Sequence, residues 1–361
     1  MILEKSLIQR QVPALPRITK EAWKETREEL IRTMCEKEYG MPVPAPESLS
    51  FEEGAITLKF CAGLGIQYTV TAHTVVCGKP FDFPFTVSLP IHTDGPVPFF
   101  VFNNFHHGEP NMDLPVEEIV DRGFAVLHVN YKDVTSDDGD FTNGLAGYLY
   151  PNGGEGRGLH EPGKIQMWAW ANMRMMDYAM SCDKLDHKNG AVIGHSRLGK
   201  TALVTGMLDE RFRYVCSNNA GCSGDAITRR KEGERIRDIT DRFPYWFCEN
   251  YKNYVDMDSS RGSMDFDQHF LLAAIAPRVV MVGAAYEDNW ADPSSQQLCC
   301  VAASPAWEAL GEKGYISADR IPWVGDHFNE GNVCFHMRRG SHFLSRLDWN
   351  DYMDTIEKKI K

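Results

Sequence analysis

Residues 190–200 read Gly-Ala-Val-Ile-Gly-His-Ser-Arg-Leu-Gly-Lys. The apolar run from Ala191 to Ile193 is typical of a buried parallel strand, and the residues after Lys200 are typical of a helix start. The tight turn between them, with Ser196 in it, indicates a nucleophile elbow, which holds a serine hydroxyl at a helix N-terminus that suits an oxyanion. The second glycine of the common Gly-x-Ser-x-Gly pattern comes one residue late, at Gly199. A strand-to-helix turn without catalysis therefore stays open as an alternative.

Length and composition predict an ordinary globular protein. The 361 residues are 43% hydrophobic and 24% charged, which is enough for one large core, and we expect residues 1–361 to form a single domain. Within it, residues 1–60 would form an N-terminal helix and extension, and residues 225–265 a rim or lid insertion. The net charge of −12 argues against nucleic acid as a partner, and no run approaches the ~18 apolar residues of a membrane span.

The ten cysteines are scattered, with only Cys299 and Cys300 adjacent, which favours free thiols. No ligand spacing for zinc is present, so we expect neither a metal nor a cofactor. The first residues lack the basic start and apolar segment of a signal peptide. The sequence as it stands thus predicts a cytoplasmic protein, or a secreted one if a leader has been removed.

Hydrophobic periodicity predicts an α/β fold. Alternation around Tyr68–Ala72 and Phe83–Leu89 indicates an antiparallel hairpin, whereas solid apolar runs indicate strands that are covered on both faces. Those runs are residues 97–102, 124–129, 191–193 and 278–284, and the predicted helices are 21–39, 116–121, 164–180 and 347–359. Residues 136–163 have little periodicity and are interpreted as a long surface loop. The pattern predicts a three-layer αβα sandwich, the α/β-hydrolase fold with a mainly parallel central sheet.

Nucleophile, acid and base follow in the chain order of an α/β-hydrolase: Ser196, then Glu287 or Asp288, then His342. The serine needs an imidazole to take its proton, and the imidazole needs a carboxylate to fix its tautomer and orientation. His342 follows Gly340 and precedes the last helix, where the base of this fold belongs. His195 is a poorer base because it adjoins the serine.

Two further histidines, His106 and His107, follow a core strand in the loop where such folds place an oxyanion donor. We interpret them as rim residues, with contact to substrate as the alternative.

With these residues assigned, the chain resembles the glucuronoyl esterases, which cleave esters of 4-O-methylglucuronic acid that link xylan to lignin. The resemblance rests on residues 194–200, Phe-Pro-Tyr-Trp-Phe-Cys at 243–248, Glu-Asp-Asn-Trp-Ala-Asp-Pro at 287–293, and Arg-Gly-Ser-His at 339–342. It implies that Arg197 stabilises the oxyanion, that Lys200 reaches sugar hydroxyls, and that Trp290 flanks the sugar. One departure is that Asn219 stands where many members carry the glutamate of the triad, which leaves Glu287 and Asp288 for that role.

We therefore expect a serine carboxylic-ester hydrolase that acts on a small-molecule or oligosaccharide uronate ester through a Ser-His-Asp triad and an acyl-enzyme. A carbohydrate acetyl esterase is the alternative within the enzymes. A sugar-binding protein with a degenerate triad is the alternative outside them. The oligomeric state is not predictable from these patterns.

Overall fold

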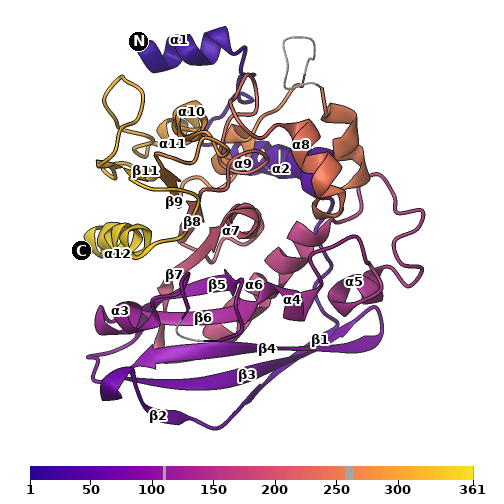
Figure 1. Cartoon of the computed structure of the whole chain (residues 1–361), viewed down its shortest axis with the longest axis vertical. Coiled ribbons are helices and arrows are strands. Elements are labelled where there is room, and N and C mark those ends of the chain that lie inside the picture. Colours follow the sequence, from indigo (N-terminus) through magenta and orange to yellow (C-terminus); the bar gives the residue numbers. More distant parts are fainter. Residues whose placement is uncertain (109–110, 257–263, 361) are drawn as a thin grey trace.

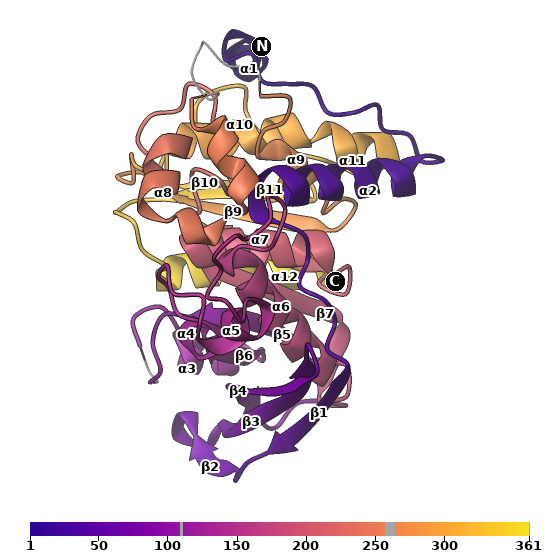
Figure 2. The ribbon, with the colours of Figure 1, turned by 90° about the vertical axis from the view of Figure 1, so that its right-hand side faces the viewer.

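The computed structural model describes residues 1–108, 111–256 and 264–360, and its centre is one mixed β-sheet (Figures 1 and 2). The strands are β1 (Ser48–Glu53), β2 (Thr57–Phe60), β3 (Gly65–Val76), β4 (Lys79–Pro90), β5 (Val97–Asn104), β6 (Ala125–Asn130), β7 (Leu185–His195), β8 (Tyr214–Asn218), β9 (Val279–Ala285), β10 (Asp326–Phe328) and β11 (Val333–Arg338). Their order is β1-β3-β4-β6-β5-β7-β8-β9-β11-β10, and β2 pairs with β3. The strands from β6 to β11 in this order are parallel, and antiparallel strands complete both edges.

Helices cover both faces of the sheet. The α-helices are α1 (Ile2–Gln9), α2 (Trp23–Met34), α3 (Val116–Asp121), α4 (Tyr131–Val134), α5 (Gly144–Leu149), α6 (Lys164–Ala179), α7 (Arg197–Leu208), α8 (Ile236–Arg242), α9 (His269–Ala273), α10 (Pro293–Ala303), α11 (Pro305–Leu310) and α12 (Arg346–Ile360). Shorter turns are the π-helical η1 (Cys35–Tyr39) and the 3₁₀ segments η2 (Cys61–Gly63), η3 (Pro244–Trp246) and η4 (Glu249–Tyr254).

Alternation along β5 shows how the sheet separates two cores. Val101 points into the larger core, which contains α6 and α7, whereas Phe100 and Phe102 point into the smaller core beneath α3 and α12. There both rings meet Trp349 edge-on, with centroids 5.1 and 5.6 Å apart. Figure 1 shows α3 and α12 on one side of the sheet and α6 on the other. The three-layer α/β fold predicted from the apolar runs is confirmed.

Several predicted elements coincide with observed ones. The helix 116–121 is α3, the helix 164–180 is α6, and the predicted hairpin is β3–β4, closed by the pair Val76 and Lys79. The interpretation of residues 136–163 as loop alone was wrong, because α5 lies within it and buries Leu145 and Ala146. The expected rim insertion 225–265 contains α8, η3 and η4, but residues 257–263 of it lie outside the described ranges.

The described residues also show whether a helix could span a membrane and whether the cysteines are paired. Within them, no helix combines the length and apolar character needed to cross a bilayer. All ten cysteines carry free thiols, and most of them are buried.

The fold brings the carboxyl ends of four neighbouring strands together. Strands β7, β8, β9 and β11 are adjacent and parallel, so the loops that follow them leave from the same edge of the sheet. These loops begin with or contain Ser196, Asn219, Asp288 and His342. In open α/β sheets this edge is where ligands bind.

A buried charge cluster anchors the loop that carries His342. The Asp348 carboxylate at the start of α12 accepts hydrogen bonds from Arg338 Nε and from the Ser345 backbone N–H, both at 2.7 Å, and these residues lie on either side of the loop. His336 on β11 places Nε2 3.0 Å from Asp348 and Nδ1 2.7 Å from Asp351. Burial by itself lowers the pKa of His336, but Asp351 and Asp348 outweigh burial and raise this pKa from 6.5 to about 9.

This pKa shift predicts a pH dependence of stability. Between about pH 6.5 and 9 the folded chain holds a proton on His336 that the unfolded chain has released, so the free energy of unfolding falls as pH rises. The full change is about 3 kcal/mol, since each unit of pKa difference corresponds to about 1.4 kcal/mol. Denaturant titrations across this window should show the decline in the wild type and a shallower decline in His336→Gln. His327→Gln, which changes the more exposed partner of Asp351, should keep the wild-type slope; equal slopes in all three proteins would contradict the assignment.

Candidate active site

Ser196 occupies a sharp turn between β7 and α7. Its backbone has φ 57° and ψ −125°, a conformation that non-glycine residues rarely adopt. The Ser196 N–H donates to the Asn218 carbonyl on β8 at 2.9 Å, which fixes the turn to the neighbouring strand. Gly194 must be glycine, because a Cβ there would lie 1.9 Å from the Leu198 carbonyl oxygen. The local geometry is that of a nucleophile elbow.

His342 and Asp288 meet across the loops that follow β11 and β9. His342 Nδ1 lies 2.7 Å from Asp288 Oδ2, and because a carboxylate only accepts, Nδ1 carries the donated proton. The Asp288 side chain is 3% exposed, and its Oδ1 also accepts the Ala291 N–H at 3.2 Å. His342 Nε2 is thereby left in the form that can accept a proton.

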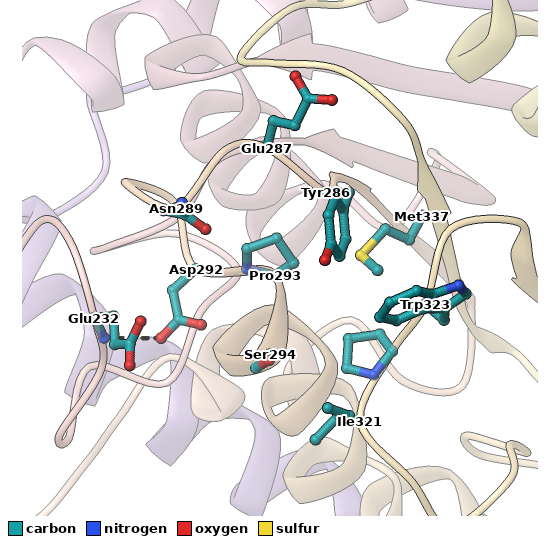
Figure 3. Close-up of a pocket in the computed structure, with 11 residues that line it drawn as sticks. Glu232, Tyr286, Glu287, Asn289, Asp292, Pro293, Ser294, Ile321, Trp323 and Met337 are labelled. Carbon is teal, nitrogen blue, oxygen red and sulfur yellow. Dashed lines mark hydrogen bonds between the residues drawn. The ribbon is translucent and has the colours of Figure 1, made fainter.

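Glu287, the other acid expected from the sequence, does not contact His342. Its side chain is exposed and lies at the rim of a second cavity, where Figure 3 shows the carboxylate pointing away from the other lining residues. The two neighbouring acids diverge at the turn after β9, in which the Asp288 N–H donates to the Ala285 carbonyl at 3.0 Å.

The ring of His195 packs beside the ring of His342. His195 is buried, its Nδ1 donates to Asn218 Oδ1 at 2.7 Å, and its ring lies 4.5 Å from the His342 ring. Burial, reinforced by the neighbouring His342, lowers the pKa of His195 to about 3. A neutral neighbour does not oppose the formation of positive charge on His342.

One cavity of about 180 Å³ is lined by Ser196, Arg197, Lys200, Trp290 and His342. The structure thus brings together these five residues predicted from the sequence, with Asp288 hydrogen-bonded behind His342. Trp290 is 47% exposed, so its ring is available to a ligand rather than committed to packing.

Arg197 is held in place by a buried carboxylate and by aromatic rings. Its guanidinium pairs with Asp137, whose side chain is 5% exposed. Asp137 also accepts hydrogen bonds from Tyr131 Oη at 2.9 Å and from Trp246 Nε1 at 2.7 Å. The guanidinium lies 4.7 Å from the centre of the Trp246 ring and 5.4 Å from that of Phe243, both within cation–π range. Few conformations remain for this side chain.

Lys200 is buried one helical turn after Ser196, and its ammonium donates to the Ala220 carbonyl. Burial lowers the pKa of Lys200, and the nearby Glu234 opposes that shift. Of the three donors on the ammonium, one is used by Ala220, so hydrogens remain for a ligand in the cavity.

Asn219 lines the same cavity but takes no part in the His342 contact. Its backbone has φ 47°, and its N–H donates to the Gly283 carbonyl at 2.8 Å. Within the described ranges, neither amide atom of its buried side chain has a hydrogen-bond partner. At the position where the resemblance implies an acid in many members, this chain thus has a neutral polar group that lines the cavity.

Sequence reasoning missed several residues of the cavity wall. Glu234, Arg242, Phe243 and Trp246 line it from the segment around α8 and η3, and Asp137 lies behind Arg197. The aromatic cluster 243–247 was the available signal, whereas Asp137 had none because it lies in a polar stretch without periodicity.

His106 and His107 belong to acid pairs instead. His106 Nε2 lies 3.3 Å from Asp113, and His107 Nδ1 lies 3.5 Å from Asp133. Neither histidine is among the described residues that line the cavity at Ser196 and His342.

Comparison with known proteins identifies a matching family model. The family model described as "Glucuronyl esterase, fungi" matches residues 73–311, which hold the elbow, Asp288 and the aromatic wall.

The chain belongs to the glucuronoyl esterase family.

Proteins similar to this chain include curated esterases and solved structures. Carbohydrate esterase MZ0003, from an unknown prokaryotic organism, is 35% identical over 239 residues, which cover 66% of this chain and 54% of that protein. The 4-O-methyl-glucuronoyl methylesterase of Podospora anserina is 27% identical over 303 residues, covering 81% and 57%. The chain therefore spans about half the length of these curated relatives.

Solved esterase structures match over nearly the whole chain. The glucuronoyl esterase from Solibacter usitatus superposes with a TM-score of 0.86 at 27% identity, covering 97% of this chain and 98% of that one. A promiscuous CE15 esterase from a marine bacterial metagenome gives 0.85 at 26% identity, with 96% of each chain covered.

The Arg197–Asp137 pair predicts a loss of turnover in Asp137→Asn. Without the carboxylate, the guanidinium is no longer held toward the cavity, and kcat for an aryl acetate should fall roughly tenfold, less than the 10²–10³ expected when an oxyanion donor is removed outright. Asp138→Asn is the matched control, because Asp138 is 60% exposed and lies next in the chain.

A double-mutant cycle separates positioning from general damage. If Asp137 acts through Arg197, adding Asp137→Asn to Arg197→Ala should cost no further turnover. Additive losses, or full activity in Asp137→Asn, would contradict the positioning role.

Proposed function

We propose that this chain is a serine carboxylic-ester hydrolase that cleaves esters of glucuronic or 4-O-methylglucuronic acid. The observation that carries the proposal is the 2.7 Å hydrogen bond from His342 to buried Asp288, with His342 and Ser196 on the wall of one cavity. Two cations, Arg197 and Lys200, line the same cavity, and membership of the glucuronoyl esterase family adds support.

In the first step Ser196 Oγ attacks the ester carbonyl carbon, and His342 Nε2 takes the hydroxyl proton. The carbonyl π-electrons move to oxygen, which becomes an oxyanion in a tetrahedral intermediate. Asp288 keeps the imidazole in the required tautomer and stabilises the imidazolium that forms.

The oxyanion is stabilised from the start of α7. Arg197 is the first residue of that helix, so its backbone N–H has no intrahelical acceptor and can donate to the cavity. Its guanidinium adds a fixed positive charge that Asp137 orients. Donors that are already oriented cost little reorganisation when the charge develops.

The intermediate collapses by breaking the bond from the carbonyl carbon to the alcohol oxygen. His342 gives its proton to that oxygen, the alcohol leaves, and the uronoyl group remains esterified to Ser196. Water then attacks the acyl-enzyme while His342 takes its proton, and the second collapse returns a proton to Ser196 Oγ and releases the uronic acid.

The acyl side of the cavity carries the groups suited to a sugar ring. Lys200 offers ammonium hydrogens to ring hydroxyls, and the exposed face of Trp290 suits the apolar face of the same ring. In the substrate of an acetyl esterase the sugar is the leaving alcohol, so its ring would lie away from Lys200 and Trp290, and these residues would not contribute to its recognition.

The acid assignment predicts that Asp288→Asn lowers kcat by orders of magnitude, up to about 10⁴-fold, because the imidazole loses its orienting carboxylate. Glu287→Gln is the matched control one residue away and should retain turnover, as should Asn219→Ala. Steady-state kinetics on a methyl glucuronate ester give the comparison. Loss of turnover in Glu287→Gln with near-full activity in Asp288→Asn would reverse the assignment.

The substrate assignment predicts different kinetic defects for the two cations. Lys200→Ala should raise KM for methyl glucuronate esters and leave simple aryl acetates nearly unchanged, because its contact is to the ring. Arg197→Ala should lower kcat on both substrates by roughly 10²–10³, because its contact is to the developing charge.

Acetylated xylose provides the decisive control for this pair of variants. Faster hydrolysis of acetylated xylose than of any glucuronate ester, with Lys200→Ala indifferent to both, would replace the uronate esterase by an acetyl esterase. Absence of turnover on all esters would favour a sugar-binding protein.

A further inference from the structure

A second cavity, of about 370 Å³, lies on the other side of the loop that carries Asp288 (Figure 3). Residues 286–292 form a wall between the two cavities. Asp288 points inward to His342 and Trp290 lines the catalytic cavity, whereas Tyr286, Glu287 and Asn289 line the second cavity.

The wall is held firmly by the segment before α8. Gly233, with φ 70°, packs so closely that a Cβ there would lie 2.4 Å from the Asn289 carbonyl oxygen. The Glu234 N–H donates to the Trp290 carbonyl at 3.1 Å, and the Glu232 N–H donates to Asp292 at 2.9 Å. The second cavity is therefore a built feature with a fixed position relative to Ser196.

One side of this cavity is aromatic and open to solvent. Trp323 is 57% exposed and Tyr286 is 43% exposed, and their rings meet at 65° with centroids 5.3 Å apart. Figure 3 shows Tyr286, Met337 and Trp323 together along one wall, with Ile321 below. Exposed apolar side chains that cluster at a cavity mark a binding site for a partly apolar ligand.

The opposite side offers hydrogen-bond acceptors without positive charge. Glu232, Asn289 and Ser294 lie there, and the Asp292 carboxylate is already used by the N–H groups of Glu232 and Ser295. No lysine or arginine is among the described residues that line the cavity. A second uronate or another anion is thus disfavoured, which contrasts with the two cations of the catalytic cavity.

We infer that the cavity between Trp323, Tyr286 and Asn289 is a binding subsite for a neutral pyranose ring. Such a ring has an apolar C–H face that stacks on an indole or phenol and a rim of hydroxyls that donate to carboxylate and amide oxygens. Because the wall is a single loop, the subsite seats a neutral sugar of the same oligosaccharide whose uronate ester lies at Ser196. This last link rests on the proposed esterase function.

The binding itself can be observed without any turnover. With 5-fluorotryptophan incorporated, the ¹⁹F resonance of Trp323, assigned by its loss in Trp323→Phe, should shift saturably when xylotetraose is added to millimolar concentration. The internal controls are Trp168, Trp170, Trp307 and Trp349, which are buried and line neither cavity. Asn289→Ala should weaken the effect severalfold. An unmoved Trp323 resonance, or a shift produced by tetramethylammonium and not by the sugar, would overturn the subsite.

Kinetics then test the link to catalysis. Trp323→Ala should raise KM about tenfold for a methyl glucuronate ester carried on xylotetraose and leave the KM of the monosaccharide ester unchanged. Leu58→Ala, which removes a 72% exposed apolar side chain on β2, is the surface control and should change neither. Equal effects of Trp323→Ala on both esters would overturn the link.

The two proposals fail in different ways. If the esterase assignment is wrong, no uronate ester is turned over by the wild type, while the ¹⁹F shift of Trp323 with xylotetraose persists. If the subsite is wrong, both esters are hydrolysed and the resonance does not move.

Discussion

The hydrogen bond between His342 and Asp288 joins the loops that follow β11 and β9, which also meet where the Glu287 N–H donates to the Gly340 carbonyl at 3.0 Å. The loops leave β11 and β9, which are parallel neighbours, so the register of these strands sets the distance between the two side chains. The buried Asp348 carboxylate accepts hydrogen bonds from Arg338 and Ser345, and these bonds fix the loop that carries His342. The position of His342 beside the cavity thus depends on the buried charge cluster at the start of α12.

The distribution of charge around the cavity is set by the partners of Arg197, Lys200 and His195. Arg197 faces a buried carboxylate that fixes its direction, Lys200 is buried beside Glu234, and His195 stays neutral. The cavity therefore has positive charge on side chains of fixed orientation, and the His342 imidazole has no charged imidazole beside it. This division of roles would be lost if the histidines were equally exposed to solvent.

The sequence predicted the sheet and much of the site for identifiable reasons. Buried parallel strands are continuous apolar runs, and the elbow, the loop after β9 and His342 are local patterns in a known chain order. The chain order could not distinguish Glu287 from Asp288 as the partner of His342. Only the course of the backbone after β9 decides which of the two side chains points toward His342. Strand β11 was not assigned, since His336 interrupts its apolar run and is accommodated only by the distant Asp348 and Asp351.

Asp137 could not be predicted by any local pattern. It lies in a polar stretch, and its role depends on Tyr131, Trp246 and Arg197 converging from three separate segments. Likewise, the wall formed by Phe243 and Trp246 comes from a segment without a helical or strand period. Contacts of this kind are set by tertiary packing.

The loop 286–292 has a consequence for how this enzyme can change. One short segment holds the carboxylate that contacts His342, one wall of the cavity at Ser196 and one wall of the second cavity. Substitutions in it alter several properties together, so it offers little freedom to laboratory evolution. Residues 321–323 line the second cavity and residues 242–246 line the cavity at Ser196, both from separate segments, so variation there can be selected independently of the contact between His342 and Asp288.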